Sequence, residues 1–418
     1  MLTKLWARDV EPFDELEVPL GSRLNLLTGD NGLGKTFVLD LAWYVLTGAW
    51  ADKSALARRG DKVEPTIGFQ FVADGYEASK EASFSFREQR WIRDGELSAP
   101  LVVGVKADGG FNVWDPLRAS GPMKLGVGVK AWGPSRQFSL QAPNVWDGLT
   151  TDDGVVLCNG LLRDWVSWQY QRPALFKLFS RVLATLSPNA GEALRPGASR
   201  RVSIEDVRDV PTLVLPYGDV PVTHASAGMR RVLALAYVLV WAWHEHGEAA
   251  RLRNQKPLNE LALLIDEVDA HLHPQWQRVI LPALFRAVSE LAGSLSVQVI
   301  VSTHAPLVLA SVESFFNEAT DKLLHFTLSE GGKIVVEDLP WAKQGDVTNW
   351  LVSESFGLEQ ARSREAEAAI EAAEAFMRGE PKPPPLATRE AIDAELRRVL
   401  AGHDPFWPRW LVETGAVK

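Results

Sequence analysis

Three short apolar runs lie far apart along the chain, and each of them ends in polar or charged residues. They occupy residues 23–28, 260–265 and 297–302. Runs of this length and apolarity are typical of strands that are buried on both faces of a parallel sheet. Longer apolar stretches with helical spacing lie at residues 37–46 and 232–244. The pattern therefore predicts an α/β fold in which buried strands alternate with helices.

A different pattern fills residues 65–130, where shorter strand-like runs alternate with Gly and Asp turns. The triplet Asp108-Gly109-Gly110 is a hairpin signal, and hairpins join antiparallel strands. We therefore expect an antiparallel arm sheet within residues 51–150. Its predicted strands are Thr66–Val72, Ala82–Phe86 and Leu101–Val105.

Residues 155–190 carry a helical pattern, and we assign residues 151–219 to a helical lobe. No sustained heptad repeat separates the first apolar helix from residue 220, so a long coiled-coil arm is excluded. The apolar stripe of the lobe includes Leu161, Leu162, Trp165, Val166 and Trp168.

The C-terminal segment, residues 316–418, is expected to hold a strand followed by a helical tail. Two helices are predicted at Glu365–Arg378 and Arg389–Leu400, and the proline-rich run Pro381–Pro385 is a stiff break between them. The aromatic segment His403–Trp410 follows. It can dock on a partner protein or pack back on its own chain, and the sequence leaves both alternatives open.

The most informative chemical pattern is the glycine-rich stretch from Gly29 to Thr36, which lies between the first predicted strand and its helix. A glycine-rich turn at a helix N-terminus directs backbone N–H groups and the helix dipole at one anion. Lys35 can reach the β- and γ-phosphates of a nucleotide, and Thr36 can ligate Mg²⁺. We therefore expect ATP and Mg²⁺ as cofactors. The expected nucleotide contacts are Gly29, Asn31, Gly32, Leu33, Gly34, Lys35, Thr36 and Phe37.

Two other strand ends carry groups suited to hydrolysis. Asp266 and Glu267 follow the apolar run at residues 260–265, which is a Walker B pattern. Asp266 is the second expected Mg²⁺ ligand, and Glu267 is the expected base that polarises the attacking water. His304 follows the run at residues 297–302 and can sense the γ-phosphate. The expected catalytic residues are Glu267, His304 and Lys35.

A short polar segment, Ala225-Ser226-Ala227-Gly228-Met229-Arg230-Arg231, opens the helix predicted at residues 232–244. Ser226 can cap that helix, because a serine side chain accepts a hydrogen bond from the first helical turn. Gly228 permits the close approach of a phosphate. The segment lies between the glycine-rich loop and the Asp266-Glu267 pair, and this order along the chain is more specific than the segment itself.

In this order the motifs resemble the ABC/SMC-like ATPases, in which a Ser-x-Gly signature lies between Walker A and Walker B. The resemblance is closest to the RecF-like and OLD-like AAA ATPases of bacterial anti-phage defence modules, such as those of Septu and retron systems. It covers residues 1–50 and 220–315, the nucleotide-binding core of a head that we place at residues 1–315. It also includes Ser302-Thr303-His304 and the loop from Asp269 to Pro274.

The resemblance implies that two heads sandwich two ATP molecules, in a homodimer or a higher oligomer. Ser226, Gly228 and Arg230 would then contact the nucleotide that is bound to the other subunit. Asp269 would lie in the D-loop at the same interface, although Val268-Asp269 stands where many relatives have Pro-Glu, so the path of this loop is open.

The family also carries a Q-loop glutamine that completes the metal shell. Gln137 and Gln141 lie in a suitable stretch. The sequence does not select between them, and a third alternative is that neither has this role.

The net charge of the chain limits the kinds of partner molecule that it is expected to bind. The chain has 418 residues, 46% of them hydrophobic, and a net charge of −9, so it has no basic footprint for nucleic acid as a whole. A local basic set could still contact DNA, and a solvated surface is the other interpretation. The basic set consists of Arg195, Arg200, Arg201, Arg208, Arg230 and Arg231.

Cysteine use and hydropathy indicate the compartment. The single cysteine, Cys158, excludes an intrachain disulfide and suits a reducing cytoplasm. The sequence begins with a strand-like segment rather than a signal peptide, and it has no apolar run of ~18 residues. We therefore expect a cytoplasmic location and no membrane partner.

Three functions fit these observations. The leading one is an ATPase head that dimerises on ATP and controls a separately encoded effector, a nuclease in anti-phage defence. The chain shows no Toprim, HNH or Cys-x-x-Cys pattern, so we expect no nuclease within it. The alternatives are a RecF-like repair ATPase that binds duplex DNA and a nucleotide-controlled scaffold with little turnover.

Overall fold

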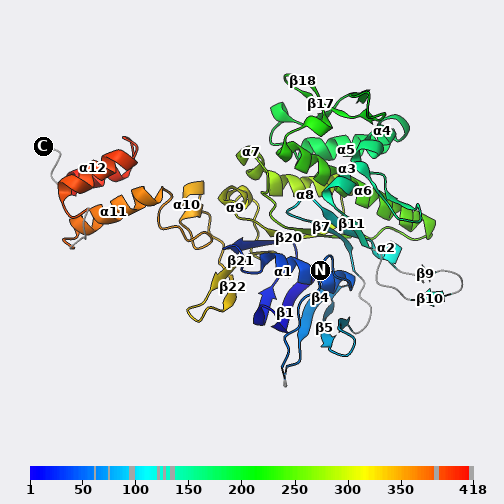
Figure 1. Ribbon diagram of the computed structural model, residues 1–418, viewed down its shortest axis with the longest axis horizontal. Helices are drawn as coiled ribbons and strands as arrows, with labels where there is room; N and C mark the ends of the chain where they lie inside the picture. Colours follow the sequence, from blue (N-terminus) through cyan, green and yellow to red (C-terminus); the bar gives the residue numbers. More distant parts are fainter. Residues whose placement is uncertain are drawn as a thin grey trace. The chain divides into compact units, whose positions relative to one another are not determined.

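A computed structural model describes residues 1–60, 63–73, 76–93, 99–119, 123–125, 129–131, 137–380 and 386–413. The chain divides into two compact units, Met1–Gly345 and Asp346–Lys418. The first unit contains two sheets with helices packed on them, and the second is built from helices (Figure 1).

An eight-stranded sheet forms the centre of the first unit, and its five inner strands run parallel. These strands are nearly continuous apolar runs, as expected where helices cover both faces. The outer strands at each edge pair antiparallel. In spatial order the strands are β11 (Gln137–Leu140), β8 (Phe111–Trp114), β7 (Leu101–Val105), β19 (Glu260–Ile265), β20 (Ser296–Ser302), β3 (Leu24–Gly29), β21 (Asp321–Leu328) and β22 (Ile334–Asp338).

The predicted α/β fold is therefore confirmed, and the three apolar runs lie side by side as β19, β20 and β3. Helix α1 (Lys35–Thr47) packs between this sheet and the arm sheet (Figure 1). Its buried side chains, among them Val38, Trp43 and Leu46, join one cluster with strands of both sheets. This packing fixes the helix that follows the glycine-rich loop.

The arm sheet differs from the prediction in its membership. It has five antiparallel strands, in the order β2 (Phe13–Pro19), β1 (Leu2–Val10), β4 (Thr66–Ala73), β5 (Tyr76–Ser85) and β6 (Arg90–Arg93). Leu101–Val105 was expected in this arm but belongs to the central sheet, because all five of its residues are buried and only a central strand has both faces covered. Residues 1–19, expected in the nucleotide-binding core, supply two arm strands.

The predicted hairpin at Asp108-Gly109-Gly110 is present, with Gly109 in a left-handed conformation at φ 88°. It joins β7 to β8 and therefore lies in the central sheet rather than in the arm.

The helical lobe packs its predicted apolar stripe inward. Helices α4 (Leu161–Gln171) and α5 (Pro173–Thr185) bring Trp165 and Phe179 together, with ring centroids 4.9 Å apart. Small strands, β14 to β18, occupy residues 195–221 of the same lobe. The long helix α6 (Ala227–Leu252) follows, and Ser226 caps it as predicted by accepting a hydrogen bond from the Met229 N–H.

The boundary predicted at residue 315 is too early, because the first unit continues to Gly345. Strand β21 pairs in parallel with β3 from Asp321 to Phe326, which includes backbone beside Gly29. Backbone hydrogen bonds to the strand that leads into the glycine-rich loop hold this segment in the head rather than in the tail.

The second unit contains α10 (Val347–Leu351), α11 (Arg364–Met377), α12 (Arg389–Val399) and α13 (Phe406–Glu413). The two predicted helices are confirmed, whereas Pro381–Pro385 lies outside the described residues. The aromatic segment packs back on its own unit, since Phe406 and Trp410 share a cluster with Ile370 and Ile392.

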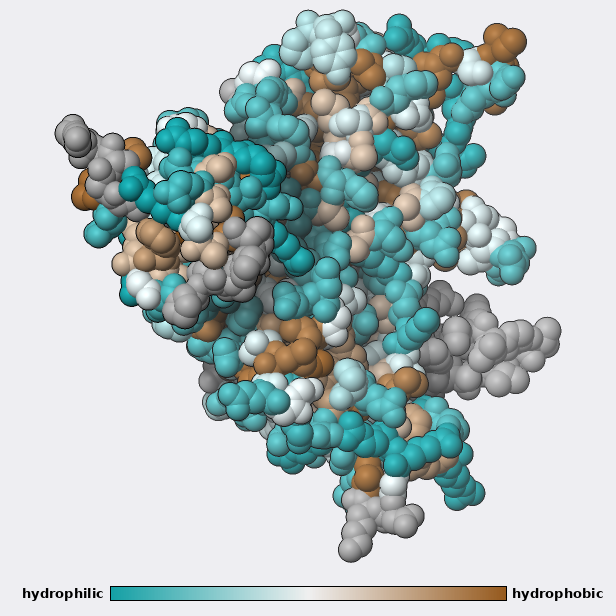
Figure 2. All heavy atoms as spheres, turned by 60° about the vertical axis from the view of Figure 1, so that its left-hand side comes forward, coloured by the Kyte–Doolittle hydropathy of each residue, from teal (hydrophilic) through white to brown (hydrophobic). Residues whose placement is uncertain are grey.

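Figure 2 shows hydrophobic residues scattered in separate patches over a mainly hydrophilic face. Within the described part of the chain, no helix combines the length and the apolarity needed to cross a bilayer.

Trp410 is the anchor of the second unit, being 1% exposed, and its indole N–H donates to Asp393. Trp410→Ala should destabilise this unit by about 3–5 kcal/mol, because a buried aromatic ring is replaced by a cavity. Chemical unfolding followed by circular dichroism should show an early transition for residues 346–413. Val412→Ala removes a 70% exposed side chain on the same helix and should change little. Equal stability of the two variants would contradict the assigned core.

Candidate nucleotide-binding site

The glycine-rich loop joins β3 to α1 in a conformation that requires glycine. Gly29 and Gly34 have φ values of 118° and 93°. A Cβ on Gly29 would lie 2.2 Å from the Phe326 carbonyl oxygen, and a Cβ on Gly34 would lie 2.5 Å from the Phe13 ring. The loop therefore gains its shape from left-handed residues and from the close approach of β21 and β2.

Lys35 is the first residue of α1, and its side chain turns back into the loop. The ammonium group donates to the carbonyl oxygens of Gly29 at 2.8 Å and Asp30 at 2.6 Å. Burial lowers the pKa of Lys35, while the nearby carboxylates of Asp30, Asp266 and Glu267 oppose that shift. The positive charge is thus held inside the loop at an energetic cost, as expected of a group that binds anions.

The hydroxyl of Thr36 and the carboxylate of Asp266 meet although they are far apart in sequence. Thr36 Oγ1 donates to Asp266 Oδ2 at 3.0 Å, and Ser302 Oγ donates to Asp266 Oδ1 at 2.6 Å. Hydroxyl and carboxylate oxygens are the hard donors that Mg²⁺ prefers. These two side chains therefore fit the predicted metal. Thr36 lies in the first turn of α1, Asp266 follows β19, and Ser302 ends β20.

Glu267 occupies a strained turn at the end of β19. Its φ of 48° is left-handed, which is uncommon for a residue with a side chain. The Ser302 hydroxyl accepts its backbone N–H at 2.8 Å, and Val268 N–H donates to the Ser302 carbonyl. Hydrogen bonds from β20 therefore orient the carboxylate that was predicted to act as the base.

His304 lies beside the same loop. Burial lowers the pKa of His304 below its usual value, and the charge of Lys35 acts in the same direction, so the imidazole is mainly neutral near pH 7. Asp269 accepts hydrogen bonds from the Thr303 hydroxyl and from the His304 backbone N–H, the latter at 3.3 Å. The D-loop aspartate is therefore tied to the strand end of its own head.

These groups line one cavity of about 270 Å³. The lining residues are Asn31, Gly32, Gly34, Lys35, Thr36, Asp266, Glu267, Ser302 and His304. The structure thus brings together the predicted catalytic and metal-binding residues with most of the loop. Three predicted nucleotide contacts are not among the lining residues. Gly29 packs against the Phe326 backbone, Leu33 is buried, and the Phe37 ring stacks on Phe13 with centroids 5.2 Å apart.

Ser226, Gly228 and Arg230 are not among the residues that line this cavity. Ser226 and Arg230 are exposed, and the Arg230 guanidinium lies over the Trp146 ring at 5.0 Å. Gly228 packs on the D-loop, where an added Cβ would approach the His271 carbonyl oxygen to 2.9 Å. The signature segment therefore contacts its own D-loop and leaves its polar side chains accessible.

Arg231 had been grouped with a basic surface set, and the structure corrects that interpretation. Its guanidinium is half-buried and donates to the carbonyl oxygens of Lys106 and Ala107, at 2.9 and 3.2 Å, and to those of Asp266 and Glu267, both at 3.3 Å. One side chain at the start of α6 thus holds the ends of β7 and β19 together. The sequence signal was its position three residues after Gly228, but no local pattern identified its acceptors.

The remaining basic set is also largely engaged. Arg208 pairs with Asp206 and Asp147, and Arg201 lies 3.7 Å from Asp209. These contacts favour a charge-balanced surface at the lobe over a basic stripe for DNA.

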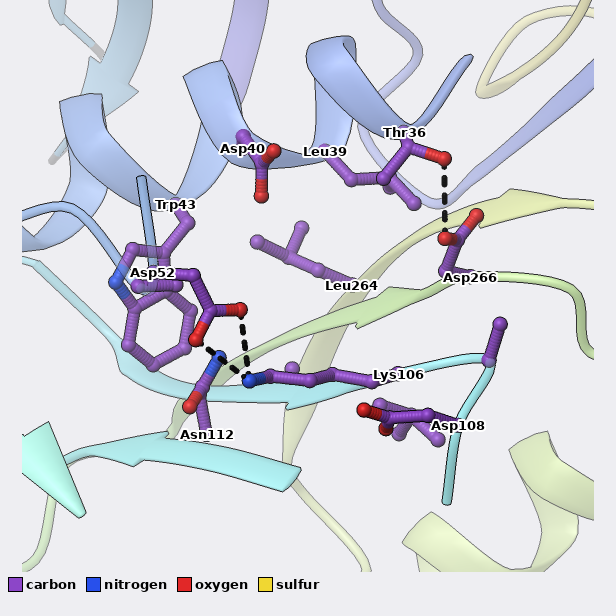
Figure 3. Close-up of a pocket in the computed structure, with 14 residues that line it drawn as sticks. Thr36, Leu39, Asp40, Trp43, Asp52, Lys106, Asp108, Asn112, Leu264 and Asp266 are labelled. Atoms are coloured by element: carbon purple, nitrogen blue, oxygen red, sulfur yellow. Dashed lines mark hydrogen bonds and ion pairs between the residues drawn. The ribbon is translucent and has the colours of Figure 1, made fainter. Parts of the chain in front are cut away.

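Neither glutamine candidate reaches the metal-binding pair. Gln137 accepts from the Trp43 indole and donates to the carbonyls of Trp50 and Ala51. Gln141 caps helix α3 (Ala142–Asp147). The strand next to Walker B, β7, is followed instead by Lys106, and a second cavity opens there beside Thr36 and Asp266 (Figure 3). Sequence analysis missed this region because β7 had been placed in the arm.

Arg231→Ala should lower ATP turnover roughly 100-fold, because small displacements of reacting groups have effects of this size. Arg231→Lys should recover only part of it, since an ammonium cannot bridge four carbonyls as a guanidinium does. ATP affinity, measured by equilibrium binding, should change little. Arg90→Ala, on an exposed edge strand, is the matched control. Wild-type turnover in Arg231→Ala would show that the bridge does not position Glu267.

Comparisons with known proteins agree with these motifs. The family model described as "AAA domain, putative AbiEii toxin, Type IV TA system" matches residues 174–310. The retron Vc95 probable ATPase of Vibrio cholerae serotype O1 biovar El Tor is 44% identical over 61 residues, which are 14% of this chain and 11% of that protein. The Septu protein PtuA of Bacillus thuringiensis is 28% identical over 104 residues, 24% of this chain and 23% of that protein. The matched segments thus span less than a quarter of these relatives' own lengths.

Solved structures align over more of the chain but at low identity. The SMC head domain from Thermotoga maritima is 16% identical with a TM-score of 0.40, and the alignment covers 81% of this chain and 99% of that chain. The recombination mediator protein RecF is 14% identical with a TM-score of 0.37, over 81% of this chain and 98% of that chain. The chain therefore has the fold of an ABC-type P-loop ATPase, and short segments of it are similar to retron probable ATPases and to the Septu protein PtuA.

Proposed function

We propose that this chain is an ATP-hydrolysing head that dimerises around ATP and controls a separate effector in anti-phage defence. One observation carries the enzymatic part: a single cavity collects Lys35 and Thr36 from the first turn of α1 together with Asp266, Glu267 and His304, which follow the ends of two parallel strands. An anion-binding loop, hard oxygen donors and a free carboxylate are the groups that phosphoryl transfer to water requires.

Each residue has a distinct role in this proposal. Lys35 binds the β- and γ-phosphates, and its present carbonyl acceptors, Gly29 and Asp30, keep it directed into the loop. Thr36 and Asp266 hold Mg²⁺, which when bound neutralises developing phosphate charge. Glu267 accepts a proton from the attacking water, and neutral His304 donates a hydrogen bond to the γ-phosphate.

The signature segment completes the site of a second copy. Ser226 and Arg230 are exposed, and they are absent from the cavity that holds their own Lys35. Their hydroxyl and guanidinium groups suit a γ-phosphate presented by another head. Asp269 and His271 belong to the D-loop, and Gly228 of the signature segment packs against His271. The D-loop therefore lies at the same interface as the signature segment in this proposal.

Two inactive variants should complement each other. Lys35→Ala removes phosphate binding, and Ser226→Arg blocks the signature, so a mixed dimer contains one doubly damaged site and one intact site. The mixture should recover part of the ATP turnover that neither variant shows alone. Glu267→Gln should dimerise in ATP, as measured by light scattering. A monomeric Glu267→Gln protein at saturating ATP, beside an active wild type, would refute the head dimer.

The effector part rests on similarity. Short matches to retron probable ATPases and to a Septu protein support this part, and the second unit, with its own hydrophobic core, offers a separate surface for a partner. We assign the partner to a nuclease by analogy with the anti-phage ATPases that the motifs resemble, because the sequence of this chain shows no Toprim, HNH or Cys-x-x-Cys pattern of its own.

Cells that carry the chain with its neighbouring genes should resist phage, and Lys35→Ala should abolish that resistance. Plaque counts measure the effect, with Arg90→Ala as the control for expression. Survival after ultraviolet damage should be equal in both strains. Full resistance with Lys35→Ala would separate ATP from defence, and salt-dependent duplex binding with a loss of damage survival would instead favour a repair ATPase.

A further inference from the structure

Arg230 of the signature segment is held by an aromatic ring rather than by a carboxylate. Its guanidinium carbon lies 5.0 Å from the centre of the Trp146 ring. Throughout the described part of the chain, no hydrogen bond or ion pair engages the Arg230 side chain. By contrast, Arg208 pairs with two carboxylates, and the neighbouring Arg231 donates to four carbonyl oxygens.

The way in which Arg230 is held matters because an arginine binds phosphate through its N–H groups. A salt bridge occupies these donors, so an arginine that is paired with a carboxylate has to break that contact before it binds another anion. A cation–π contact is an attraction between the charge and the ring, and it requires none of the five N–H donors. Since Arg230 is exposed, a second molecule can reach these donors.

The carboxylate next to Trp146 in the chain does not compete for Arg230. Asp147 follows Trp146 directly and pairs with Arg208 at 2.5 Å. Arg208 also pairs with Asp206, so this group of charges is balanced within the lobe. The Trp146 ring therefore remains as the contact that directs the Arg230 guanidinium.

Trp146 is itself fixed in the fold. It is 9% exposed and lies in α3, which packs against α4 and α6 (Figure 1). Gln141 and Asn144 form a capping box at the start of this helix, and at its end the Gly148 N–H donates to the Asn144 carbonyl oxygen at 2.9 Å. Helix α3 follows β11 directly, and β11 pairs with β8 in the central sheet. The Trp146 ring thus connects the edge of the central sheet to the signature segment.

The same stretch of chain carries both glutamines that the resemblance suggested for the metal shell. Gln137 lies on β11 and Gln141 at the start of α3, and neither reaches the metal-binding pair. Trp146 lies near the end of the same helix, where it meets Arg230. The stretch therefore contributes a ring to the signature segment rather than an oxygen to the metal.

We propose that Trp146 is a positioning residue for the signature segment. It holds the Arg230 guanidinium by a cation–π contact, so that the N–H donors meet the γ-phosphate of a nucleotide bound to a second copy of the head. This inference rests on the proposed ATPase function and specifies how one head prepares the site of the other. A side chain that is already held in place loses less conformational freedom on binding, and this strengthens the dimer.

The test uses the full chain with Glu267→Gln and measures the dimer dissociation constant by sedimentation in saturating ATP. Arg230→Met removes the guanidinium and keeps an unbranched stem, so it should weaken the dimer roughly ten-fold or more. Trp146→Leu should weaken it about five-fold, the effect of losing one cation–π contact. Trp146→Phe keeps a ring with a weaker attraction for the cation and should lose about two-fold.

A double variant separates positioning from packing. Once Arg230→Met has removed the cation, Trp146→Leu should cause no further loss, because the ring then has no charge to hold. An equal loss in both backgrounds would assign Trp146 to packing alone and overturn the inference. ATP affinity, measured at protein concentrations too low for dimerisation, should be unchanged in Trp146→Leu, since this residue does not line the phosphate cavity.

Trp407→Leu is the matched control. It also removes a ring from an arginine, since the Arg397 guanidinium carbon lies 5.8 Å from the Trp407 ring centre, but this pair belongs to the second unit. It should leave the dimer unchanged, and circular dichroism verifies that each variant folds. A normal dimer with both Trp146 variants, beside a weak one with Arg230→Met, overturns the positioning role alone. A normal dimer with Arg230→Met refutes the proposed engagement of the signature segment itself.

Discussion

The parallel pairing of β3, β20 and β19 is the constraint on which the site depends. Asp266 follows β19 and Ser302 ends β20, while β3 leads into the loop that places Thr36 at the start of α1. Backbone hydrogen bonds keep the three strands in register. The result is a short chain of contacts in which Thr36 and Ser302 both donate to Asp266, while Ser302 also accepts from the Glu267 backbone. Because three strands must stay aligned, the apolar interior of the sheet and the buried face of α1 serve the chemistry as directly as the polar residues do.

Arg231 connects this site to the surface that a second head would meet. It lies on α6 within two turns of Ser226. Its guanidinium donates hydrogen bonds to the backbone carbonyls that follow β7 and β19. Gly228 packs on the D-loop at His271, so the signature segment has two rigid links to its own catalytic strand end. A force on the signature is therefore transmitted to Glu267, whose left-handed backbone has few alternatives.

Neither glutamine that the family resemblance suggested lies at the metal-binding pair. Gln137 is held by Trp43 and two backbone carbonyls, and Gln141 lies at the N-terminus of α3. Polar side chains from α1 and β8, among them Asp40 and Asn112, line the second cavity together with Asp266. Burying several polar side chains costs free energy unless a charged or strongly hydrogen-bonding occupant compensates for that burial.

The sequence by itself determined the elements whose signals are contiguous. The glycine loop, the strand ends at Asp266 and Ser302, the Ser226 cap and the helices of the tail depend on local conformation and apolar spacing, and they lie where the pattern placed them. Only the tertiary structure decided which sheet receives Leu101–Val105, that residues 321–338 belong to the head, and that Arg231 is an internal bridge. Those outcomes depend on pairing between segments far apart in the chain, and a short apolar strand or a single arginine carries no local record of its partner. The same holds for Asp40 on α1 and Asn112 on β8. They line one cavity only because α1 packs on the central sheet.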